Sequence, residues 1–148
     1  MSAQRPAPLG RADFPHVQSI TTRWTDNDAY GHVNNIVYYS YFDTVVNTWL
    51  IGGGHLDIQK SLAIGVVAET SCHYFSPLTY PETVTAGLRV IHLGRSSVRY
   101  EIAIFAEGAE VAAAQGQFVH VYVDRATRRP VEIPRALRAA LEGLAPPA

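Results

Sequence analysis

The sequence predicts an α+β protein in which an antiparallel sheet wraps around one long central helix. Two patterns carry this expectation. Residues 35–50 have apolar side chains at helical spacing and on most of the remaining helix surface, and the second half of the chain contains long stretches that alternate apolar and polar residues. A helix that is apolar nearly all round needs cover on most sides, which a curled antiparallel sheet provides.

The composition fits one globular domain. The chain has 148 residues, of which 47% are hydrophobic and 17% charged, and its formal net charge is -1. This balance gives no global attraction for nucleic acid or an anionic membrane, and no segment reads as a membrane span. The single cysteine, Cys72, excludes an internal disulfide and a cysteine-based zinc site. We therefore expect a cytoplasmic protein that binds neither nucleic acid nor membranes.

The N-terminal third predicts an arm, a strand and a polar loop. Residues 1–15 contain three prolines among small and charged residues, and we expect a flexible arm there. Residues 16–148 are expected to form the single domain. Within it, residues 16–24 are apolar and β-branched, which predicts the first strand, and residues 25–31 form a loop rich in Asp and Asn.

The central helix has recognisable ends. Asn34 can cap its start with a side-chain oxygen, and the three glycines at 52–54 supply the backbone freedom that ends it. Its apolar residues recur from Tyr38 to Trp49 on several faces. We expect this helix to be buried on most sides.

After residue 60 the spacing of the apolar residues changes from that of a helix to that of strands. Residues 61–75 are β-rich, and residues 83–90, 98–105 and 111–123 alternate with tight turns between them, which predicts an antiparallel meander. Residues 133–144 place three leucines on one helical face after a proline, so a short C-terminal helix should pack on the domain.

Two carboxylates, a histidine and several amides gather directly ahead of the central helix, in residues 23–35. A helix N-terminus presents unpaired N–H groups and partial positive charge, which suit polarising a carbonyl and stabilising an oxyanion, and a nearby carboxylate could act on the same carbonyl. Asp and Asn ahead of a helix more often form Asx turns and caps. Spacing alone leaves both interpretations open.

The run from Asp26 to Asn35, with the aromatic residues that follow it, resembles the signature of hot-dog fold thioesterases of the 4-hydroxybenzoyl-CoA thioesterase type. The resemblance extends more loosely to residues 74–78 and 93–97 and covers about residues 16–125. It implies the hot-dog fold and hydrolysis of acyl-CoA thioesters to free acid and CoA. It also implies a homodimer or homotetramer, since such sheets pair edge to edge and an exposed strand edge favours pairing.

The resemblance also assigns roles to residues. Asp28, the second acidic residue of an Asp-x-Asp pair, corresponds to the catalytic carboxylate, as nucleophile or general base, whereas Asp26 would order the loop. The backbone N–H near Asn35 would form the oxyanion hole. For His32 the alternative to substrate binding is a structural hydrogen bond, and for Tyr38 and Tyr39 the alternative is packing in the core. The implied substrate-binding residues are Gly31, His32, Val33, Asn34, Tyr38 and Tyr39.

Two arginine-containing turns are candidates for the phosphates of coenzyme A, with solvated surface charge as the alternative. The six histidines show no metal-ligand spacing, so we expect no metal. We also expect no cofactor, because coenzyme A is part of the substrate. The candidate CoA-binding residues are Arg95, Ser96 and Ser97 in one turn and Arg128 and Arg129 in the other.

The expected activity is therefore that of an acyl-CoA thioesterase. Two other functions remain open from the sequence. A hot-dog hydratase or dehydratase acting on enoyl-CoA or acyl carrier protein would use His32 with Asp28, the only local pair of that kind. A non-catalytic acyl-CoA-binding module would bind the thioester without releasing thiol.

Overall fold

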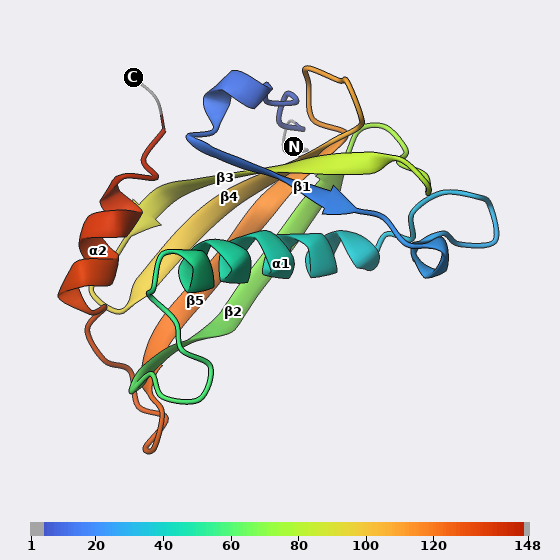
Figure 1. Cartoon of the computed structure of the whole chain (residues 1–148). Coiled ribbons are helices and arrows are strands. Elements are labelled where there is room, and N and C mark those ends of the chain that lie inside the picture. Colours follow the sequence, from blue (N-terminus) through green and yellow to red (C-terminus); the bar gives the residue numbers. More distant parts are fainter. Residues whose placement is uncertain (1–4, 147–148) are drawn as a thin grey trace.

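The computed structural model describes residues 5–146, in which one five-stranded antiparallel sheet is crossed by the helix α1 (Val37–Gly52). Figure 1 shows α1 lying across one face of the sheet, which confirms the predicted α+β arrangement. Within the described residues, no helix is long and apolar enough to cross a membrane. The other elements are β1 (His16–Thr21), β2 (Ala63–Tyr74), β3 (Thr83–Leu93), β4 (Ser97–Phe105), β5 (Ala114–Asp124) and α2 (Arg135–Glu142).

The strand order is β1-β3-β4-β5-β2, so the predicted meander of three consecutive strands forms the middle of the sheet. β1 pairs with β3, with His16 opposite Leu88, and β2 pairs with β5, with Tyr74 opposite Ala114. β1 and β2 are therefore the two edges. Among residues 5–146 no strand lies beside the outer backbone groups of β2.

The core lies between α1 and the sheet. Phe42, Val45 and Val46 of α1 are fully buried against strand residues such as Leu88 and Ile102. Each such side chain contributes about 1.5–3 kcal/mol of transfer free energy. Leu137 and Leu141 of α2, with Leu144 just after its end, cover one end of this core, and these are the three leucines that the sequence placed on one face.

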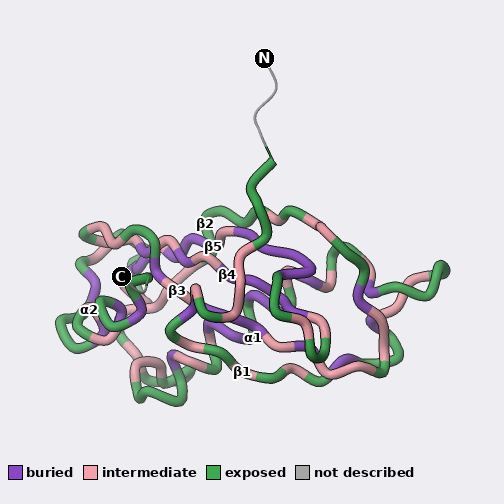
Figure 2. Tube along the Cα trace, turned by 90° about the horizontal axis from the view of Figure 1, so that it is seen from above, coloured by how far each residue is buried: buried purple, intermediate pink, exposed green. Residues whose placement is uncertain are grey.

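One side of α1 remains open, contrary to the expectation of burial on most sides. Ser40, Asp43, Thr44 and Thr48 are exposed, because a single sheet covers only the face of α1 that it contacts. Figure 2 shows buried residues concentrated between the helix and the central strands, and more exposed residues along the edge strands β1 and β2.

Part of the predicted flexible arm, residues 1–15, is packed on the sheet. The backbone N–H of Ala112 donates to the Leu9 carbonyl at 2.8 Å, and Phe14 is 6% exposed with its ring edge-on to Phe105. Gly87 leaves the space for this ring, since a Cβ there would lie 2.6 Å from it. An aromatic residue among the prolines thus anchors the stretch, and residues 1–4 lie outside the described part of the chain.

Candidate active site

Asp26 fixes the loop that leads into α1. Its carboxylate is fully buried and accepts hydrogen bonds from the Arg23 backbone N–H at 2.8 Å, the Arg23 guanidinium and the Tyr41 hydroxyl at 2.8 Å. Burial alone would raise the pKa of Asp26, but these hydrogen bonds from Arg23 and Tyr41 outweigh it and hold the pKa below its ordinary value. With no free oxygen, Asp26 orders the loop, in agreement with the resemblance.

A second set of contacts ties this loop to the segment after β2. The Val33 N–H donates to the Leu78 carbonyl at 2.8 Å, and the Thr79 hydroxyl donates to the Gly31 carbonyl at 2.7 Å. Gly31 has φ +83°, a left-handed conformation in which a Cβ is unfavourable. Gly31 and Val33 therefore have backbone roles that shape the loop.

Asp28 combines a structural role with a free oxygen. Its Oδ1 accepts hydrogen bonds from the backbone N–H groups of Tyr30 at 2.8 Å and His32 at 3.4 Å, and its own N–H donates to the His32 carbonyl at 2.8 Å. This is the Asx turn that the sequence left open. Among the described residues Oδ2 has no hydrogen-bond donor, so the same carboxylate keeps one oxygen for another molecule.

The helix begins two residues later than predicted, at Val37. Asn34 does not cap the first turn; its side-chain oxygen accepts the Ile36 N–H at 3.2 Å, and its carbonyl accepts the Val37 N–H at 2.9 Å. Asn35 lies between these bonded groups, and no hydrogen bond of the described chain uses its N–H. The Asn35 carbonyl, which belongs to the next peptide unit, accepts a hydrogen bond from the Tyr74 hydroxyl at 2.9 Å, so the backbone on the C-terminal side of Asn35 is held in place.

Asp28 and Asn35 face one groove of about 430 Å³. Its size is typical of sites for small molecules. The lining residues come from the loop before α1, the first turn of α1 and the end of β2 with the segment after it. They are Asp28, His32, Val33, Asn35, Tyr38, Tyr74, Phe75, Ser76 and Pro77.

The groove gathers only part of the predicted substrate contacts. His32, Val33 and Tyr38 line it with Asp28 and Asn35. The remaining three lie outside its lining: Gly31 and Asn34 shape the backbone, and Tyr39 packs its ring against Phe42 at 6.0 Å.

Two tyrosines and a cysteine beside the groove stay protonated near neutral pH. Tyr38 and Tyr74 meet edge to face with ring centroids 5.0 Å apart. Burial raises the pKa of Tyr38 to about 12 and that of the Cys72 thiol to about 11. A neutral thiol is a poor nucleophile. Within residues 5–146 there is no cluster of three or more His, Cys, Asp or Glu side chains that could hold a metal ion.

The wall opposite Asp28 was missed in the sequence. The resemblance covers Tyr74 to Pro77 only loosely and assigns them no role, although an aromatic pair at a strand end followed by a proline is a recognisable signal. Its place beside the loop depends on the register of β2, in which Tyr74 pairs with Ala114. Such a register is not readable from local pattern.

The predicted CoA-binding residues lie at the other end of α1. The carbonyl of Arg95 accepts hydrogen bonds from Ile133 and from Arg138 of α2, and Figure 1 shows α2 beside the C-terminal end of α1. Ser96 and Ser97 share that turn. A helix of 16 residues is about 24 Å long, so within one chain this turn does not meet the Asp28 groove.

Arg128 and Arg129 lie in the turn after β5, which also stands away from the groove of the same chain. The Arg128 N–H donates to Asp124, and the Arg129 carbonyl accepts the Asp124 N–H, both at 2.8 Å. Asp124 in turn pairs with Ala63, the first residue of β2. This turn is therefore next to the start of β2, whereas the groove is at its end.

Comparisons with known proteins identify the family and the fold of the chain. The family model of the thioesterase-like superfamily matches residues 22–141. The chain is 53% identical to the PA5185 protein of Pseudomonas aeruginosa, with a TM-score of 0.93, covering 96% of this chain and 99% of that one. It is 32% identical to a thioesterase of Thermus thermophilus solved in complex with coenzyme A and Zn, with a TM-score of 0.74 and coverages of 89% and 95%.

A DHNA-CoA thioesterase of Staphylococcus aureus, at 22% identity, shares the fold, with a TM-score of 0.74 and 86% of each chain covered. No curated protein matches the sequence. The match of the family model over most of the chain and the 32% identical thioesterase lead to one conclusion: the chain belongs to the thioesterase-like superfamily, as a thioester hydrolase with the hot-dog fold.

Proposed function

We propose that this protein hydrolyses acyl-CoA thioesters to a free carboxylic acid and CoA, with Asp28 as its catalytic carboxylate. The observation that carries the proposal is the groove before α1, where an unpaired carboxylate oxygen of Asp28 and an unpaired N–H of Asn35 line the same space. A carbonyl carbon placed between such groups would meet a nucleophile or base on one side and a hydrogen-bond donor for its oxygen on the other.

The reaction needs one water and no other reagent. The thioester oxygen accepts the Asn35 N–H, at the positive end of the α1 dipole, where negative charge on the tetrahedral intermediate is stabilised. Asp28 either removes a proton from the attacking water or attacks the carbonyl itself, in which case water hydrolyses the resulting anhydride. In both routes a C–O bond replaces the C–S bond, and the leaving thiolate takes up a proton.

Coenzyme A is the leaving group that the relatives support. The Thermus thermophilus thioesterase, 32% identical over most of both chains, was solved with coenzyme A. The groove of about 430 Å³ holds the acyl and thioester part of such a substrate and leaves the nucleotide outside.

A second copy of the chain would complete the site. The free edge of β2 exposes Val67 at 51%, and an unpaired strand edge favours pairing with another chain. Antiparallel pairing of β2 with its symmetry copy sets the start of one strand beside the end of the other. Arg128 and Arg129 of the second copy would then approach the groove at Tyr74, where they could bind CoA phosphates. Sedimentation as a monomer would contradict this dimer.

The variant Asp28→Asn tests the proposal. It keeps the size and the Oδ1 acceptor of the Asx turn but removes the charge, so we expect the protein to fold and the rate of thiol release from acyl-CoA to fall by about 10²–10⁴-fold. Glu142→Gln, which removes an exposed carboxylate at the end of α2, should keep the wild-type rate.

Thiol release should be followed across short, long and aromatic acyl-CoAs, and thiol release and enoyl absorbance should be followed in parallel with an enoyl-CoA. Thiol release without a change in enoyl absorbance separates hydrolysis from hydration. A wild-type rate in Asp28→Asn would show that Asp28 is not the catalytic carboxylate.

A further inference from the structure

The N-terminal arm reaches the wall of the Asp28 groove. The guanidinium carbon of Arg5 lies 4.9 Å from the centroid of the Phe75 ring, and Phe75 lines the groove. A cation over the face of an aromatic ring is attracted to the negative charge of that face. Arg5 is exposed and forms no ion pair or side-chain hydrogen bond within residues 5–146, so Phe75 is its partner in the described chain.

Gln115 of β5 holds the arm in the place that this contact needs. Gln115 is 3% exposed, its side-chain oxygen accepts the Leu9 N–H at 2.8 Å, and its amide donates to the Ala7 carbonyl at 3.0 Å. If the arm detached, both ends of this side chain would lose their partners, and buried polar groups are nearly always paired. The arm is therefore attached to the sheet two residues after Arg5.

The same end of β5 supports the groove wall. The backbone N–H groups of Phe75 and Ser76 both donate to the carbonyl of Ala113, at 2.7 and 3.1 Å, and both residues line the groove. These bonds fix the backbone of Phe75 but not its ring, which is half-buried and can turn about its side-chain torsions. The Arg5 contact restricts the ring, because a turn of the ring would give up the cation–π geometry.

We propose that Arg5 is a positioning residue of the substrate site, which holds the Phe75 ring in the orientation that packs against the acyl group. This rests on the proposed thioesterase function, in which the groove receives the acyl and thioester part of the substrate. A side chain that is ordered before binding loses less conformational entropy when the ligand arrives, so the contact strengthens binding. Arg5 itself does not line the groove, so its effect reaches the substrate through Phe75.

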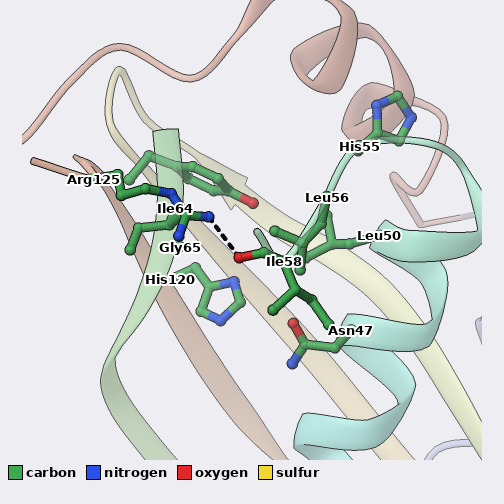
Figure 3. Close-up of a pocket in the computed structure, with 10 residues that line it drawn as sticks. Asn47, Leu50, His55, Leu56, Ile58, Ile64, Gly65, His120 and Arg125 are labelled. Atoms are coloured by element: carbon green, nitrogen blue, oxygen red, sulfur yellow. Dashed lines mark hydrogen bonds between the residues drawn. The ribbon is translucent and has the colours of Figure 1, made fainter. Parts of the chain in front are cut away.

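The arm concerns this groove alone. A second cavity, of about 290 Å³, lies between α1, the start of β2 and the loop that joins them, as Figure 3 shows. It shares no lining residue with the Asp28 groove, and no hydrogen bond or ring contact of residues 5–14 involves its lining. A change at Arg5 should therefore alter binding in the Asp28 groove and leave the second cavity as it is.

Two non-hydrolysable thioethers, S-benzyl-CoA and S-methyl-CoA, are the probes. They carry the same phosphates and differ only in the group that would enter the groove. We expect Arg5→Gln to weaken binding of S-benzyl-CoA about two- to fivefold, the worth of one exposed cation–π contact, and to leave binding of S-methyl-CoA unchanged. Calorimetry measures both affinities without turnover. Because Arg5 is exposed, the variant should fold as the wild type does.

A double-mutant cycle tests whether Arg5 acts through the ring. In the Phe75→Leu background, Arg5→Gln should have no further effect on either affinity. Arg135→Gln, which removes an exposed arginine at the start of α2, is the matched control and should bind both thioethers as the wild type does. In turnover, Arg5→Gln should raise KM for benzoyl-CoA by the same factor and leave kcat unchanged, because Asp28 and Asn35 are not altered.

Equal affinity of the wild type and Arg5→Gln for S-benzyl-CoA would overturn the proposal. An equal loss for both thioethers would also overturn it, because Arg5 would then bind a CoA phosphate directly. Neither outcome counts against the proposed hydrolysis, since the wild-type protein still binds both probes. Failure of the wild-type protein to bind either thioether would contradict the proposed function and overturn this proposal with it.

Discussion

Unpaired polar atoms lie near both ends of α1, but they are accessible to solvent at one end and buried at the other. At the N-terminal end, Asp26 is fully bonded, while the free atoms of Asp28 and Asn35 open onto a groove. At the C-terminal end, the free Nδ1 belongs to His120, which is 2% exposed. Free atoms in a groove cost little, because water reaches them and a substrate can displace it, whereas a buried free atom is costly until a ligand or water pairs with it. The first arrangement leaves polar atoms that a substrate can reach, and the second leaves one buried atom without a partner among the described residues.

Removing the Asp26 carboxylate should destabilise the loop before α1. Asp26→Ala leaves the buried Tyr41 hydroxyl and the Arg23 groups without their acceptor, so we expect a loss of about 4 kcal/mol in the free energy of unfolding. Activity should fall as well, because Asp28 and Asn35 depend on this loop. Urea unfolding and thiol release measure the two effects.

Glu142→Ala is the matched control, since its side chain is exposed on α2 and should change stability by less than about 0.5 kcal/mol. A fully active Asp26→Ala with near-native stability would mean that Arg23 and Tyr41 do not hold the loop.

Acidification should lower the free energy of unfolding, because His120, near the C-terminal end of α1, is buried in its neutral form. The pKa of His120 is about 4 in the folded protein because of burial, against an ordinary 6.5. Between these values the unfolded chain binds more protons, so this contribution to stability is complete above pH 6.5 and is lost as the pH falls towards 4. The loss should reach about 2 kcal/mol at pH 5 and about 3 kcal/mol below pH 4.

Urea unfolding at pH 7 and pH 5 measures this loss. His120→Leu should remove the 2 kcal/mol difference, and His92→Leu should retain it. The same acid loss in both variants would show that other groups cause it.

The smallest expected effect concerns Tyr74. Tyr74→Phe removes the hydrogen bond to the Asn35 carbonyl, which should cost about 1 kcal/mol of stability and loosen the backbone next to the N–H that we propose as the oxyanion donor. We expect kcat to fall several-fold with little change in KM, measured by thiol release. Tyr80→Phe, outside the groove, is the control. A change in KM alone would place Tyr74 in binding rather than in orienting Asn35.

The sequence by itself determined the elements and their order. The alternating stretches form the meander β3-β4-β5, α1 ends at the glycines 52–54, and the leucines in and just after α2 are buried. These features follow from periodicity and capping, which act over a few neighbouring residues. The Asp28 loop was found for the same reason, since its residues lie within one short segment next to the helix.

Only the tertiary structure shows which residues lie next to the Asp28 loop. The register of β2 brings Tyr74 to the groove, and the antiparallel sheet carries Arg95 and Arg129 away from it within one chain. His120 looked like any other strand residue until Gly65 and α1 enclosed it beside a cavity. Such neighbours are set by strand pairing and by helix packing over long sequence distances, and a local pattern does not contain them.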